Sequence, residues 1–113
     1  MSTLKFNQWL NSDSTENFKC RAWVNFNGTG TPAIRAAGNV SSITDNGTGD
    51  YTANFTVALP DANFAVASIG NNDGAVDGVM RARALLAGSV RLLAVNNSGT
   101  PVDLATICAA VFR

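Results

Sequence analysis

The sequence predicts an all-β fold, namely an antiparallel β-sandwich of about seven strands. Apolar and polar side chains alternate from Phe18 to Phe26, which is the period of a strand with one buried face. Asn46-Gly47 lies between two strand-like runs, which is a strong local signal for a β-hairpin. No stretch of the chain has a helical period of apolar residues.

The strands are expected to follow one another at short spacing, separated by turns rich in Gly, Asn, Asp and Pro. The second strand is interrupted at Gly38, where we expect a bulge or a bend. In the strand after the Asn-Gly turn, Tyr51 and Phe55 alternate with polar residues, so one side of that strand should be buried. The expected ranges are 18–26, 33–43, 50–57, 64–69, 79–86, 89–95 and 104–112.

The segment 79–95 reads as a hairpin whose two faces differ in character. A three-residue loop of Ala87, Gly88 and Ser89 would place Leu86 opposite Val90, Ala84 opposite Leu92 and Ala82 opposite Ala94, all on one apolar face. The other face then carries Arg81, Arg83 and Arg91 among aliphatic residues. Such a mixture suits a subunit interface, where arginine is enriched. The alternative is a solvated face on which the arginine stems lie over leucine.

The last expected strand, 104–112, is apolar on both of its sides. A two-layer sandwich buries only one face of each sheet, so a strand of this kind needs a second cover. We therefore expect another subunit to provide it, with Ile107 and Val111 in the interface beside Arg81, Arg83 and Arg91.

Residues 1–17 differ from the domain expected at 18–113. Leu4, Phe6, Trp9 and Leu10 lie among polar residues without a sustained period. Large apolar side chains are unfavourable in water, so this segment is predicted to be an extended arm that docks on a partner. The alternatives are a frayed terminus or a short strand folded on its own domain.

Composition limits the partners of the chain. Its 113 residues suit one domain, its net charge is zero and only 14% of its residues are charged. We expect no nucleic-acid partner, because that binding depends on neutralising phosphates. The chain contains no run of about 18 apolar residues, so we expect no membrane insertion. The first residues lack the basic and apolar regions of a secretory signal, so synthesis and folding in a cytosol are expected.

The residue types argue against catalysis. The chain has no histidine, which removes the usual partner of a nucleophilic serine or cysteine and the commonest metal ligand. Its acidic residues are scattered, and the loops 45–50 and 71–74 lack the ligand spacing of a calcium-binding EF-hand. We expect neither enzyme activity nor a cofactor or metal. Cys20 and Cys108 are expected to be reduced, buried packing residues, with a disulfide between neighbouring strands as the alternative.

The stretch from about Cys20 to Val66 also resembles a known family. Its strings Ala22–Phe26, AWVNF, and Ser42–Tyr51, SITDNGTGDY, resemble a module at the distal ends of bacteriophage tail fibres and tailspikes. They are also similar to small virion-surface proteins of short-tailed phages, including cyanophages. The opening MSTLK resembles the start of such phage proteins as well.

The resemblance implies a structural protein of a phage virion, made in the cytoplasm of the bacterial host. The expected form is a homotrimeric capsid decoration or cement protein on the outer shell, which stabilises the capsid and contributes to contact with the host surface. Its arm would dock on the major capsid protein. Only residues 1–17 precede the module, whereas a tail fibre would carry a shaft and an attachment domain there, so the shell is the expected location.

The alternative that the resemblance implies is a receptor-binding tip of a tail fibre or tailspike. It would contact a host-surface glycan or receptor through the exposed loops, with Asn27, Thr29, Asn46 and Thr48 as contact residues. A polysaccharide depolymerase is disfavoured by the missing histidine and the small size of the chain.

Overall fold

A computed structural model describes residues 3–5, 7–72 and 76–113 of the chain. Within these ranges the regular structure consists of β-strands, and no helix occurs. The strands are β1 (Cys20–Asn27), β2 (Ala33–Gly38), β3 (Val40–Gly47), β4 (Asp50–Phe55), β5 (Ala65–Asn72), β6 (Val76–Asp77), β7 (Val79–Leu86), β8 (Ser89–Val95) and β9 (Thr106–Phe112). The prediction of an all-β chain is confirmed.

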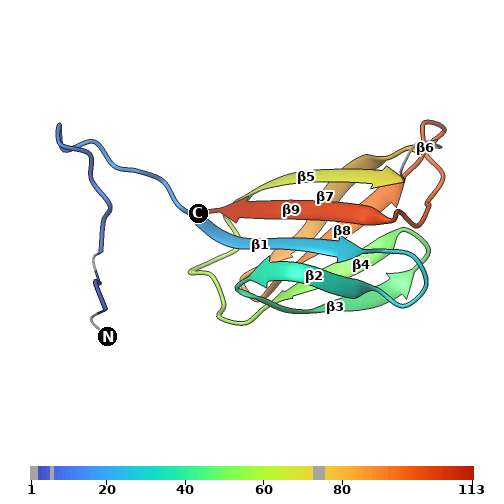
Figure 1. Ribbon diagram of the computed structural model, residues 1–113, viewed down its shortest axis with the longest axis horizontal. Helices are drawn as coiled ribbons and strands as arrows, with labels where there is room; N and C mark the ends of the chain where they lie inside the picture. The colour runs from blue at the N-terminus through green and yellow to red at the C-terminus, as the bar shows by residue number, and fades with distance from the viewer. Residues whose placement is uncertain (1–2, 6, 73–75) are drawn as a thin grey trace.

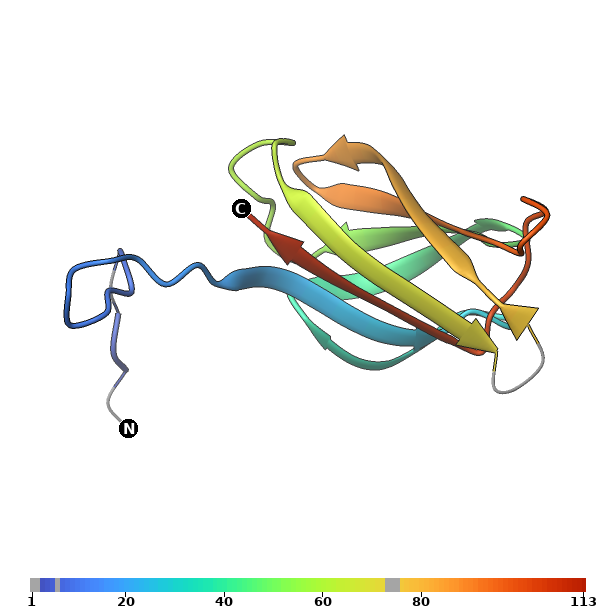
Figure 2. The ribbon, with the colours of Figure 1, turned by 90° about the horizontal axis from the view of Figure 1, so that it is seen from above.

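The strands form two antiparallel sheets that lie one in front of the other (Figure 1). One sheet has the order β2-β1-β9-β5-β6, and the other has the order β3-β4-β8-β7. Along the chain, the strands therefore pass from one sheet to the other four times, after β2, β4, β6 and β8. Figure 2 shows the two layers from above.

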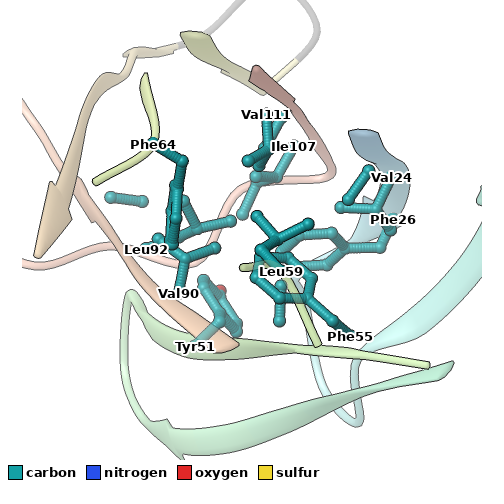
Figure 3. Packing of buried hydrophobic residues seen from close by; sticks show 14 of the residues in the cluster. Val24, Phe26, Tyr51, Phe55, Leu59, Phe64, Val90, Leu92, Ile107 and Val111 are labelled. Carbon is teal, nitrogen blue, oxygen red and sulfur yellow. The ribbon is translucent and has the colours of Figure 1, made fainter. Parts of the chain in front are cut away.

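One hydrophobic core lies between the two sheets (Figure 3). The alternation along β1 buries Ala22, Val24 and Phe26, and the alternation along β4 buries Tyr51 and Phe55, as predicted. The prediction was wrong for Phe18, which precedes β1, and for Cys20, with which β1 begins, because both are exposed. Full burial of one large apolar side chain contributes about 1.5–3 kcal/mol, so this shared core is the main force that holds the sheets together.

The core also corrects the prediction for the last strand. Ile107 and Val111 have exposed fractions of 0% and 2% and pack in the core of their own domain, so they cannot face another subunit. The outward residues of β9 are the half-buried Cys108 and Ala110, together with Phe112. The branched side chains of Ile107 and Val111 thus point into the interior, while Cys108, Ala110 and Phe112 lie on the outer side.

Gly38 marks a corner between the sheets, and the predicted single strand 33–43 is two strands. β2 ends at Gly38, and β3 begins two residues later in the other sheet. Asn39 has a φ of 56°, a left-handed conformation that asparagine tolerates better than most residues. Its side-chain amide donates to the carbonyls of Arg21 and Val57, each at 3.1 Å, and its side-chain oxygen accepts from Val57 N at 2.8 Å.

The β7–β8 hairpin has a different register from the predicted one. Its loop is the two-residue turn 87–88, and Leu86 lies opposite Ser89 instead of Val90. A bulge between Arg83 and Leu86, with Ala84 at a φ of 48°, takes up the extra residue. Beyond the bulge Arg83 pairs with Arg91, so the arginines still share the face that the sequence predicted.

Candidate functional site

The two ends of the domain carry different features (Figure 1). The N-terminal segment and the C-terminus lie at one end, where β1 begins and β9 finishes. The turns β1–β2 and β3–β4 and the connection from β8 to β9 lie at the opposite end. The chain therefore separates its N-terminal segment from three of its loops by the length of the sheets.

Tyr51 ties these three loops together. Its hydroxyl donates a hydrogen bond to Gly28 O at 2.7 Å in the β1–β2 loop and lies 2.8 Å from Asp103 Oδ1 in the β8–β9 connection. The same carboxylate oxygen accepts from Gly49 N of the β3–β4 turn at 2.8 Å. The ring is fully buried and packs edge-on against Phe26, with 5.3 Å between ring centroids. Burial, followed by the bond to Asp103, raises the pKa of Tyr51 above its ordinary range.

The four loop residues predicted to contact a receptor lie at this end, and they differ in exposure and in their hydrogen bonds. Asn27 is half-buried, and its Oδ1 accepts from Thr29 N at 2.9 Å and Thr29 Oγ1 at 2.7 Å, which closes a tight turn. Asn46 is exposed and donates to Thr52 Oγ1 at 2.7 Å. Thr48 is exposed at the tip of its turn. The structure thus gathers the four residues near one end of the domain.

The outer face of the four-stranded sheet is polar, and we call Arg81, Arg83 and Arg91 with Asp50 and Thr52 the arginine face. Arg91 forms a bidentate ion pair with Asp50 on the neighbouring strand, with Nε 2.7 Å from Oδ1 and Nη2 bonded to Oδ2. This hydrogen bonding lowers the pKa of the Asp50 carboxyl. Arg81 and Arg83 are exposed and form no ion pair with any described residue.

The outer face of the five-stranded sheet is apolar. The sequence predicted a second cover over the last strand but assigned it to Ile107 and Val111, and it did not predict that Trp23 and Ile69 belong to the same surface. We call Trp23, Ala67, Ile69, Cys108 and Ala110 the apolar face. Trp23, Ala110 and Ala67 form one cross-strand row, and Asn25, Cys108 and Ile69 form the next. These six residues line an open groove of about 650 Å³. The available signal was the large apolar side chain at Trp23, on the side of β1 opposite the core residues.

The N-terminal segment lies outside the two sheets. Leu4, Trp9 and Leu10 are exposed, while Phe6 lies outside the described residues. Its described residues form one isolated bridge, between Leu10 and Glu16, and otherwise run away from the sheets in both views (Figures 1 and 2). Its apolar side chains are thus available to a partner, and docking of this segment stays a prediction.

Both cysteines are free thiols. Their strands are neighbours, yet Cys20 lies opposite Phe112 and Cys108 lies opposite Asn25, so the alternative of a disulfide between them is not realised. Cys20 is exposed, which corrects the expectation that both are buried, and Cys108 is half-buried on the apolar face.

Comparison with known proteins returned no relative: no family model, no curated protein and no solved structure matches the chain. The resemblance to phage virion modules therefore stays a prediction. Within residues 3–5, 7–72 and 76–113, no helix is long and apolar enough to cross a membrane. No group of three or more cysteine, aspartate or glutamate side chains in that part of the chain could hold a metal ion.

Proposed function

We propose that this protein is a structural protein of a bacteriophage virion, a homotrimeric capsid decoration or cement protein on the outer shell. In this role the protein stabilises the shell and presents its loops to the surroundings, including the host surface. The proposal contains no catalytic step, cofactor or metal. Its partners are further copies of itself and the major capsid protein, and it is made in the cytoplasm of the bacterial host.

The observation that carries the proposal is the separation of the N-terminal segment from the three loops. A decoration protein needs an attachment region on the shell side and a stable domain that stands away from the shell. Leu4, Trp9 and Leu10 are exposed at one end, and the loops joined through Tyr51 lie at the other. The resemblance of residues 20–66 to virion-surface modules supports the same role.

The attachment step can be tested by deleting residues 1–14. The described part of this segment contributes no strand to the two sheets, so the shortened protein should remain soluble and folded. It should lose binding to capsids, because the exposed side chains of Leu4, Trp9 and Leu10 would each gain about 1.5–3 kcal/mol from full burial on a partner. Co-sedimentation of purified protein with undecorated phage capsids measures this binding.

A triple variant, Leu4→Ser, Trp9→Ser and Leu10→Ser, is the matched test because it keeps the chain length. Both variants should fold, as judged by circular dichroism, and both should stay in the supernatant. If the deleted protein misfolds, the segment belongs to the core of its own domain. If both variants fold and sediment with capsids like the original protein, attachment runs through the two sheets and the arm has no docking role.

A second candidate function is a distal receptor-binding module of a tail fibre or tailspike. The observation that favours it is that exposed polar loop residues gather at one end, where Thr29, Asn46 and Thr48 present hydroxyl and amide groups. Such groups are the usual hydrogen-bonding partners of a sugar or a protein receptor. The two functions differ in where the protein lies on the particle, and imaging of the virion separates them.

A further inference from the structure

The apolar face is an uncovered apolar surface on the outer side of the five-stranded sheet. Its Ile69 side chain is 71% exposed and its Trp23 side chain is 44% exposed, although both lie in the middle of paired strands. Ala67, Ala110 and Cys108 between them are small, so the groove has a broad apolar floor. Contiguous exposed apolar surface of this kind is uncommon on soluble monomers and marks an interaction site.

The polar groups around this face are already occupied. Asn25 is the polar side chain within the two rows, and its Oδ1 accepts a hydrogen bond from Arg35 Nη1 at 3.2 Å. Arg35 also donates to the carbonyl of Ala105 at 2.6 Å, which holds its guanidinium at the rim. The two rows themselves therefore carry no charged side chain, and the hydrogen-bonded guanidinium of Arg35 lies at their edge.

These features decide which partner the face suits. A charged partner would lose water on this surface without gaining a counter-charge, which is unfavourable. A second apolar sheet face meets no such penalty, because uncharged surfaces are complementary to themselves. The small side chains of Ala67, Cys108 and Ala110 also leave room for apolar side chains of neighbouring copies to pack against this sheet.

We propose that the apolar face is the surface through which copies of this chain pack on one another. The inference rests on the homotrimer of the proposed function and locates its interface. In a trimer the same face of each copy points toward the threefold axis, so Trp23 and Ile69 of all copies meet there. The arginine face then points outward, where Arg81 and Arg83 remain in water.

A pair of charge insertions on the two outer faces tests this location. Ile69 on the apolar face is 71% exposed, and Leu86 on the outer side of the other sheet is 59% exposed. Neither Ile69→Lys nor Leu86→Lys places a charge in the core, so both variants should fold. The full chain should have a mass of about three times 11.8 kDa by light scattering at micromolar concentration. Ile69→Lys should give one chain mass, and Leu86→Lys should keep the trimer.

The reactivity of Cys108 provides a second measurement that does not depend on a mass change. Cys108 is on the apolar face and Cys20 is exposed away from its centre, so each protein carries its own internal reference. In the original protein and in Leu86→Lys, a bulky maleimide should label Cys20 at least about tenfold faster than Cys108. In Ile69→Lys, labelling of Cys108 should accelerate severalfold while that of Cys20 stays the same.

The outcomes separate this inference from the proposed function. If Ile69→Lys still has the mass of a trimer and its Cys108 is still labelled slowly, the proposed interface is wrong. The trimer itself would not be contradicted by that result. Loss of the trimer in Leu86→Lys alone would move the interface to the arginine face. A monomeric original protein would overturn both the interface and the trimer, whereas the position of the protein on the virion is decided separately by imaging.

Discussion

Replacing Tyr51 with phenylalanine should lower the free energy of unfolding by about 1–3 kcal/mol, which is the usual cost of leaving a buried hydrogen-bonding group without its partner. The ring would still pack against Phe26, but Gly28 O and Asp103 Oδ1 would lose the hydroxyl that joins the β1–β2 loop to the β8–β9 connection. Urea denaturation at one fixed protein concentration measures the change. Asp61→Asn is the control, because it removes the exposed ion pair with Arg113 and should have a much smaller effect.

The same substitution should change the response to alkaline pH. Because burial raises the pKa of Tyr51, the folded protein holds the phenol proton at pH values where the unfolded chain, with a tyrosine pKa of about 10, has lost it. Stability from this group is therefore complete below about pH 10 and falls as the pH rises beyond it. The difference in the free energy of unfolding between the original protein and Tyr51→Phe should therefore become smaller above that pH. Equal stability of the two proteins at pH 7 would contradict the role given to the hydroxyl.

Gly49→Ala should destabilise the protein by about 2–5 kcal/mol, the sum of left-handed strain and overpacking. Gly49 has a φ of 66°, and a Cβ there would come within 2.4 Å of the carbonyl oxygen of Ala94 and 2.8 Å of the Val102 backbone. These contacts are between backbones of paired segments, since Ala94 N also bonds to Gly49 O at 2.7 Å. Neither side can move without disturbing the loop end.

Gly30→Ala is the matched control for this substitution. Gly30 has a φ of 63°, but nothing lies within 4 Å of the position its Cβ would take. It should therefore show only the conformational strain, about 1–2 kcal/mol. Urea denaturation of the two variants side by side isolates the effect of the close approach. Equal losses of unfolding free energy in the two variants would mean that the backbone around Gly49 shifts easily to accept a Cβ. Tyr51 would then not hold these loops rigid.

The alternation of side chains was sufficient to predict most of the strands and the buried side of several. Val24, Phe26, Tyr51 and Phe55 follow a strict period of two, and polar residues between them fix which side faces water. The Asn46-Gly47 signal predicted the β3–β4 hairpin, but not its exact turn. Asn46 and Gly47 end β3 at an irregularity in the register, and the turn itself is Thr48-Gly49, with Gly49 at a φ of 66°.

The same reasoning fails where apolar and polar residues do not alternate along a strand. β9 is apolar on both sides, so the sequence does not show that Ile107 and Val111 point inward and Cys108 and Ala110 outward. That choice depends on the space between the sheets, which only the fold defines. The bulge at Ala84 has the same origin, because alanine gives no local signal for a positive φ and the neighbouring strand imposes it.

The candidate surfaces were predicted in part. The sequence placed Arg81, Arg83 and Arg91 on one face, and the structure keeps them together. It did not predict that Asp50 would pair with Arg91, nor that Trp23 and Ile69, 46 residues apart in the numbering, would share an apolar face across β9. Both facts follow from the order of strands in the sheets, which is a long-range property.

Electron microscopy of phage particles, with an antibody raised against the purified protein, tests the central proposal most directly. A decoration protein should be labelled over the whole capsid surface, and averaged images should show threefold knobs on the shell. Particles that lack the protein should lose those knobs and the label together. Label confined to the tail would contradict the decoration role in favour of the receptor-binding alternative, and its absence from the particle would exclude both.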